Sequence, residues 1–244
     1  MPDPDRRPAY YAARSGGWRD WWTLLHPPYT AWHLSYVVIG ASLAPQLDVT
    51  RLVATLLAFF AAVGLSAHAL DELHGRPLGT SIPSVALVTV TVVGLIVAVG
   101  LGVVGVARVG LVLVPFIVVG PLLVVAYNAE LFGGIVHTDG GFAAAWGAFP
   151  LLTAYVAQAD GLGAAAVLGG VAAFAMSYAQ RSLSKPARFL RRRVQGVHGL
   201  VVLADGTTRS LDEKELRAPL EHALRAMSWG LIALAASLLV ARLW

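Results

Sequence analysis

Apolar runs of roughly twenty residues recur along the whole chain, and this repetition constrains the fold more than any other feature. The runs lie at 30–47, 51–72, 84–106, 109–128, 141–158, 161–180 and 224–243. An α-helix needs about 20 apolar residues to cross the hydrocarbon core of a bilayer. The sequence therefore predicts an all-α, polytopic transmembrane bundle with seven spans. Gly147 and Pro150 lie inside the fifth run, where such residues tend to interrupt a helix.

Composition agrees with a membrane class and excludes some chemistry. Hydrophobic residues make up 57% of the 244, and the mean hydropathy is +0.68, which is too apolar for a soluble domain of this size. The chain has no cysteine, so a disulfide framework, a cysteine metal site and a cysteine nucleophile are all excluded. Arginine far outnumbers lysine beside abundant alanine, glycine and valine, a composition typical of a GC-rich bacterial genome.

Basic residues predict the orientation, because cytoplasmic loops are enriched in arginine and lysine. With seven spans and a cytoplasmic N-terminus, the outside holds only Arg51, Arg108 and Arg242. The inside then holds Arg6, Arg7, Arg14, Arg19, Arg76, Arg181, Lys185, Arg188, Arg191, Arg192, Arg193, Arg209, Lys214, Arg217 and Arg225. We therefore expect a multi-pass protein of the cell (inner) membrane with its N-terminus in the cytoplasm and its C-terminus outside. The net charge of +4 is explained by this topology and not by nucleic-acid binding.

The same pattern divides the chain into four segments. Residues 1–29 form a cytoplasmic or interfacial segment, in which Trp18, Trp21 and Trp22 resemble an interfacial anchor and no apolar core of a signal peptide is found. Residues 30–180 form a six-helix bundle, 181–223 a basic cytoplasmic insert, and 224–244 the final helix. Within the insert, Asp205-Gly206 between two apolar or β-branched stretches predicts a hairpin, and Asp212 predicts a capped helix start.

Ionisable residues gather where the second apolar run ends. His68, Asp71 and Glu72 are spaced i, i+3 and i+4, so they share one helix face, and His74 follows closely. Polar groups at membrane depth are costly and usually mark a site. Oxygen ligands suit Mg²⁺, which neutralises a diphosphate leaving group, so Asp71 and Glu72 are candidate metal ligands. Two readings remain open: solvated residues at a helix end, and a transition-metal site using His68 and Glu72.

Two further helix ends reach the same predicted face. The fourth helix ends in Tyr127, Asn128 and Glu130, and the sixth ends in Tyr178, Gln180 and Arg181. Lys185 and Arg188 follow in the basic run after it. This one-sided concentration predicts a polar cavity that opens to the cytoplasm. The basic residues would bind a phosphate-bearing substrate there. The alternative is a positive-inside anchor that contacts anionic lipid headgroups.

Three stretches resemble the UbiA superfamily of intramembrane prenyltransferases. They are Leu25-His-Pro27-Pro28-Tyr-Thr, similar to that family's entry into its first helix; His68-x-x-Asp71-x-x-x-Gly75-Arg76-Pro77-Leu, similar to its first aspartate-rich motif and the Arg-Pro-Leu element after it; and Tyr127-Asn128-Ala-Glu130-Leu. The resemblance covers about residues 20–180. The second aspartate-rich motif is missing, because Tyr178 to Arg188 contains no carboxylate. The seven predicted spans are also fewer than the nine that are usual in that family.

The resemblance implies an isoprenoid (polyprenyl) diphosphate as substrate, with Mg²⁺ as cofactor and the bilayer as environment. Asp71 would occupy the middle aspartate position of the motif, and His68 and Gly75 would occupy the other two. Asp71, His68 and Glu72 would form the catalytic set, with Glu72 or His74 compensating for the missing aspartates, and Arg76 would contact diphosphate. The first hypothesis is accordingly a prenyltransferase that moves the prenyl group to an unidentified acceptor. The second is a non-catalytic lipid-binding or accessory protein that kept the bundle, and the third is a small proton-coupled transporter.

Overall fold

All seven apolar runs form helices in the computed structural model, which describes residues 7–244. Arg6 and the remainder of the predicted segment 1–29 that precedes residue 7 lie outside the described residues. The helices are α1 (Trp18–Leu24), α2 (Pro27–Leu43), α3 (Val49–Phe59), α4 (His68–Leu73), α5 (Ser84–Val109), α6 (Val114–Asn128), α7 (Leu131–Gly134), α8 (Asp139–Ala143), α9 (Phe149–Ala159), α10 (Ala164–Arg193) and α11 (Glu213–Leu243). Two π-helical stretches and a 3₁₀ turn connect some of them: η1 (Phe60–Ala67), η3 (Ala144–Ala148) and η2 (Leu111–Leu113).

The predicted number of seven spans is too high. Within residues 7–244, five continuous helical stretches are long and apolar enough to cross a membrane: Val49–Leu73, Ser84–Val109, Leu111–Asn128, Asp139–Ala159 and Glu213–Leu243. The run predicted at 30–47 forms α2, which has 17 residues and is about 26 Å long, shorter than the bilayer core of about 30 Å. The run predicted at 161–180 forms the start of α10, whose apolar part ends at Gln180 and Arg181.

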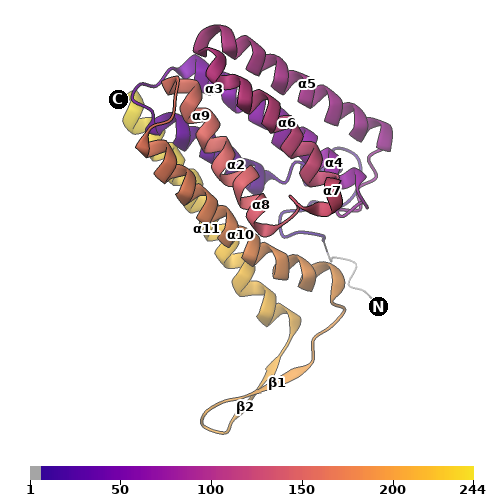
Figure 1. Cartoon of the computed structure of the whole chain (residues 1–244). Coiled ribbons are helices and arrows are strands. Elements are labelled where there is room, and N and C mark those ends of the chain that lie inside the picture. The colour runs from indigo at the N-terminus through magenta and orange to yellow at the C-terminus, as the bar shows by residue number, and fades with distance from the viewer. Residues whose placement is uncertain (1–6) are drawn as a thin grey trace.

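Helix α2 lies at the centre of the bundle. It packs against α9 and α11, while α3, α5 and α6 form one side of the molecule and α10 and α11 the other (Figure 1). Trp32, Tyr36 and Val37 of α2 are fully or almost fully buried. A short helix that is enclosed by longer ones needs no contact with lipid, which fits the position of α2 among the five spanning stretches.

Local sequence signals explain several helix boundaries. Pro27 and Pro28 occupy the first helical positions of α2, where the missing N–H costs nothing. The Asp48 carboxylate accepts a hydrogen bond from the Arg51 N–H at 3.0 Å and caps α3. The predicted fifth helix is continuous from Asp139 to Ala159, because the π-helix η3 absorbs Gly147 and Pro150 lies in the first turn of α9.

The predicted hairpin before the last helix is confirmed. Strands β1 (Gly199–Val202) and β2 (Thr208–Leu211) pair antiparallel, and Gly206 in the turn has a φ of 82°. The Asp212 side chain accepts from the Glu215 N–H at 2.8 Å and caps α11 as expected. Helix α10 extends beyond the bundle toward the hairpin, and α11 returns from the hairpin into the bundle (Figure 1). The predicted segment boundaries at 180/181 and 223/224 consequently fall inside these two helices.

Candidate functional site

The polar residues predicted from three helix ends lie within electrostatic range of one another. Arg188, Arg192 and His137 are the cationic or titratable groups whose charge acts on the Asp71 carboxylate from other elements. Arg181, Arg188, Asp71 and Asp139 act in the same way on the Tyr127 hydroxyl. The end of α4, the end of α6 and the middle of α10 therefore enclose one polar region, which we call the polar cluster.

Glu72 serves the adjacent loop. Its side chain is fully buried, and its two carboxylate oxygens accept three hydrogen bonds: from the Leu78 N–H at 2.9 Å, and from the Thr80 N–H and hydroxyl at 2.8 Å each. Hydrogen bonds to a buried carboxylate are charge-assisted and strong. Glu72 thus anchors residues 78–80 against α4, and little of its ligand capacity remains for a metal ion.

Arg76 braces the same loop. Its guanidinium donates to the Ile82 carbonyl at 2.6 Å, to the Ser84 hydroxyl at 2.7 Å and to the Thr80 carbonyl at 3.4 Å. The residue has a φ of 52°, which is unusual for a residue with a side chain and is maintained by these contacts. The structure therefore gives Arg76 two backbone carbonyls and one side-chain hydroxyl as partners. His74, next to it, is exposed.

Asp71 differs sharply from Glu72. Among residues 7–244 its carboxylate has no hydrogen bond and no ion pair, although most of the side chain is enclosed by protein. It lies in α4, the short helix that directly follows the π-helix η1, a distortion that is common next to functional sites. Asp71 is consequently the one predicted metal ligand whose oxygens stay available.

Two histidines stack beside Asp71. The rings of His68 and His26 have centroids 4.5 Å apart, and His68 Nδ1 lies 3.1 Å from the Gly64 carbonyl. His26 also contacts the Tyr11 hydroxyl through Nδ1, and its Nε2 is buried without a partner among the described residues. Burial first, and then the charges of His68, Arg192 and Arg188, lower the pKa of His26 well below its usual value, so the imidazole is neutral.

Tyr127 is buried, and its hydroxyl has no hydrogen-bond partner among residues 7–244. Its ring stacks on His137 with centroids 4.4 Å apart and meets Trp146 edge-on at 5.7 Å. The neighbouring Asn128 donates to the Val124 carbonyl at 2.7 Å and so serves its own helix. Glu130 is exposed, with one carboxylate oxygen 3.9 Å from His137 Nδ1. Of these three predicted residues, Tyr127 is the one aimed into the polar cluster.

The basic residues of α10 fall into two groups. Arg181 and Lys185 share Asp139, at 3.3 and 3.5 Å, and Arg181 also lies over the Phe142 ring. Arg188 is largely enclosed and has no hydrogen bond or ion pair within the described part of the chain. Tyr178 is half exposed and stacks on Phe174 at the outer surface of the helix. Arg188 acts on both Asp71 and Tyr127 and so belongs to the cluster, whereas Tyr178 lies outside it.

An N-terminal strap, residues 7–13, covers the cluster on one side. Ala9 and Ala12 are buried, the Pro8 carbonyl accepts from Arg192 Nε at 3.1 Å, and Tyr11 reaches His26. Tyr11 and Tyr29 also line a small pocket with Arg188. Tyr11 and His26 were absent from the predicted site residues, although His26 lies inside the Leu25-His-Pro27 stretch that carries the resemblance, and that position was the available signal.

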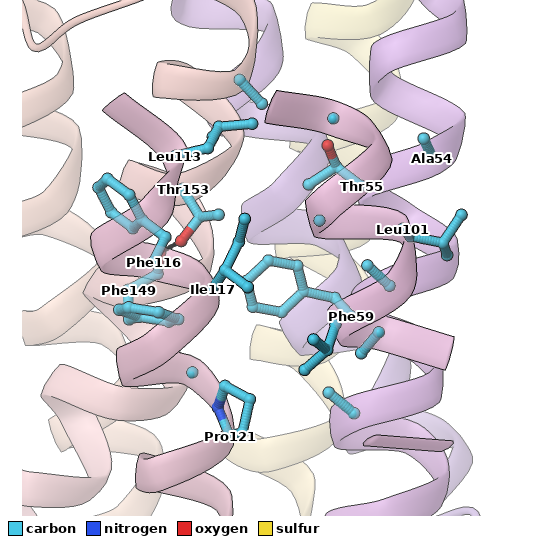
Figure 2. Close-up of a pocket in the computed structure, with 18 of the residues that line it drawn as sticks. Ala54, Thr55, Phe59, Leu101, Leu113, Phe116, Ile117, Pro121, Phe149 and Thr153 are labelled. Atoms are coloured by element: carbon cyan, nitrogen blue, oxygen red, sulfur yellow. Dashed lines mark hydrogen bonds between the residues drawn. The ribbon is translucent and has the colours of Figure 1, made fainter. Parts of the chain in front are cut away.

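An apolar cavity of about 250 Å³ lies between α3, α5, α6 and α9. Phe59, Phe116, Ile117 and Phe149 are among the side chains that line it (Figure 2). At one end it reaches Arg51 and Arg108, and at the other it reaches Val63, Val124 and Trp146. Trp146 also contacts Tyr127, so the apolar cavity and the polar cluster share a wall.

The predicted Mg²⁺ site fits these residues poorly. Within residues 7–244 no group of three or more histidine, aspartate or glutamate side chains is arranged to hold a metal ion. Mg²⁺ commonly uses one or two carboxylates together with phosphate oxygens and water. With the Glu72 oxygens engaged by Leu78 and Thr80, Asp71 is the only member of the predicted pair that is free to act.

Comparison with known proteins returns no relative: no family model, no curated protein and no solved structure matches the chain. The likeness to prenyltransferases therefore rests on the three sequence stretches alone.

We predict that Glu72→Gln destabilises the fold, because the amide nitrogen would face backbone donors. The loss should be about 2–3 kcal/mol in the free energy of unfolding, since hydrogen bonds to a charged group contribute at that level. Thermal unfolding of the purified protein in detergent micelles measures it, with the exposed Glu130→Gln as matched control. Equal midpoints for the two variants would show that Glu72 does not anchor the loop.

Proposed function

We propose that the protein binds an isoprenoid diphosphate within the membrane. The prenyl chain would lie in the apolar cavity, and the diphosphate would lie in the polar cluster. The observation that carries this proposal is the position of Trp146, which lines the cavity and contacts Tyr127 of the cluster. A ligand that fills both must have a long apolar chain and an anionic head.

The spacing along one helix supports this assignment. Val63 lines the cavity, and His68 and Asp71 follow on the same continuous helical stretch. Five residues of helix, about 7.5 Å, separate Val63 from His68, and eight residues, about 12 Å, separate it from Asp71. A ligand whose chain occupies the cavity would therefore extend its head along this helix toward His68 and Asp71. The excess of basic residues on this side of the chain makes the cytoplasm the proposed location of the cluster.

Prenyl transfer from the bound diphosphate is the second candidate, and the free Asp71 carboxylate favours it. A carboxylate beside the reacting carbon can accept the proton that an acceptor loses when it is alkylated. The resemblance adds Mg²⁺ to this candidate, with Asp71 as the remaining ligand. The alternative is a protein that binds an isoprenoid without catalysing a reaction. Two observations favour it: the Glu72 carboxylate is occupied by hydrogen bonds from Leu78 and Thr80, and the second aspartate-rich motif is missing.

We expect Ala62→Phe, which adds a ring to the cavity wall, to weaken binding of farnesyl diphosphate by roughly tenfold or more, because the prenyl chain would lose its space. Binding to protein in phosphatidylcholine nanodiscs is measured by calorimetry. Val103→Phe is the control, since Val103 is exposed on the outer face of α5. If both variants and the unaltered protein bind farnesyl diphosphate with equal affinity, its prenyl chain lies outside the cavity.

Asp71→Asn separates transfer from binding. If the protein is a transferase, release of diphosphate from farnesyl diphosphate in the presence of candidate aromatic or lipid-alcohol acceptors should fall at least ~100-fold, as expected for loss of a general base. The variant should still be folded in the membrane, because Asp71 has no partner in the described structure to lose. Full turnover by Asp71→Asn would remove Asp71 from the chemistry.

A further inference from the structure

We propose that the diphosphate head is held directly by arginine side chains, with Arg188 as the principal contact and without a bridging Mg²⁺ ion. This inference rests on the proposed function and names the groups that recognise the ligand. It reverses the expectation from the resemblance, in which carboxylates bind a metal and the metal binds the diphosphate.

The carboxylates of the region are largely committed to other partners. Glu72 accepts three hydrogen bonds from the loop, and Asp139 pairs with Arg181 and Lys185. Glu130 is exposed and faces His137. Asp71 is left as a single free carboxylate, and a single carboxylate is the minimum with which Mg²⁺ is held.

Cations outnumber these acids inside the cluster. Arg188 and Arg192 act on Asp71, and Arg181 and Arg188 act on Tyr127. With Lys185 included, four cationic side chains face three acidic ones, Asp71, Glu72 and Asp139. The region therefore carries an excess of positive charge without any metal, and the ligand that balances it is an anion.

Arg188 is a largely enclosed cation of this region. A guanidinium presents five N–H donors in a planar fork, and enclosing it away from water without acceptors is costly. Arg188 is largely enclosed between α10, the N-terminal strap and Tyr29, yet it has no hydrogen bond or ion pair within residues 7–244. Phosphate oxygens match that fork in a bidentate geometry, which favours arginine over lysine for such a ligand.

Tyr127 provides an independent observation that points to the same ligand. Its hydroxyl is buried and without a partner among the described residues, and it lies within the fields of Arg188, Arg181 and Asp71. A buried hydroxyl without a partner is unusual in a folded protein. As a neutral donor it can bond a phosphate oxygen once the ligand is present. Tyr11 of the strap lies beside Arg188 in the small pocket that the two residues line with Tyr29.

The test is the affinity of the full-length protein in phosphatidylcholine nanodiscs for farnesyl diphosphate, measured with excess EDTA and with Mg²⁺. The two dissociation constants should agree within about threefold, a difference of less than ~1 kcal/mol. Arg188→Gln should weaken binding roughly 10- to 100-fold in either condition, as loss of charge-assisted hydrogen bonds predicts. The affinity of Arg188→Lys should lie between those of the unaltered protein and Arg188→Gln, because lysine keeps the positive charge but lacks the planar fork of N–H donors.

Controls separate this inference from the proposed function. Arg209→Gln, on the projecting hairpin, should bind as the unaltered protein does. Asp71→Asn removes negative charge and should leave affinity unchanged or raise it; this variant carries the test even if Arg188→Gln fails to fold. Binding that needs Mg²⁺ and is lost in Asp71→Asn would overturn the arginine assignment alone. No binding under either condition would contradict the proposed function itself.

Discussion

A charged group that leaves water in so apolar a chain needs a partner inside the protein, and the whole polar side of this structure follows from that constraint. Glu72 meets the requirement through Leu78 and Thr80, and Arg76 through the carbonyls of Thr80 and Ile82. Glu221, between α10 and α11, meets it through Arg191 and Arg217. Because these groups are satisfied, they hold the framework together, and the exceptions stand out. Asp71, Arg188 and the Tyr127 hydroxyl lie close together and lack such partners among the described residues.

One of these exceptions, Tyr127, contacts Trp146, which lines the apolar cavity, and this contact gives the site its character. The cavity is enclosed by α3, α5, α6 and α9 (Figure 2). The polar cluster is formed by residues at the ends of α4 and α6 and in the middle of α10. Trp146 forms part of both, in the π-helical stretch η3, and η1 leads directly into His68 on the other side. Trp146 lies within one π-helical stretch, and the ionisable residues of α4 follow the other. The resulting shape suits an amphiphile with an anionic head.

Local signals in the sequence were sufficient where the structure depends on neighbours along the chain. Asp205-Gly206 predicted the hairpin turn, Asp212 predicted the start of α11, and the apolar runs located the helices. The span count was wrong because apolar length alone does not reveal that α2 is short and enclosed, or that α10 turns polar at Gln180. The sequence also could not predict the hydrogen bonds of Glu72, because its partners lie in a loop that folds back onto α4. Tyr11 and His26 come into contact only in the folded chain, and no spacing in the sequence predicts that contact.

Photo-cross-linking tests the central claim most directly. A farnesyl diphosphate analogue that carries a diazirine near the end of its prenyl chain is irradiated with the protein in nanodiscs, and the modified peptides are mapped by mass spectrometry. A ligand with its head at Arg188 and its chain in the cavity should label the cavity faces of α3 and α6, around Phe59 and Ile117, and lose that label when unmodified farnesyl diphosphate competes. Labelling confined to the lipid-facing surface of α5, around Val103, or labelling that does not compete, would contradict the account.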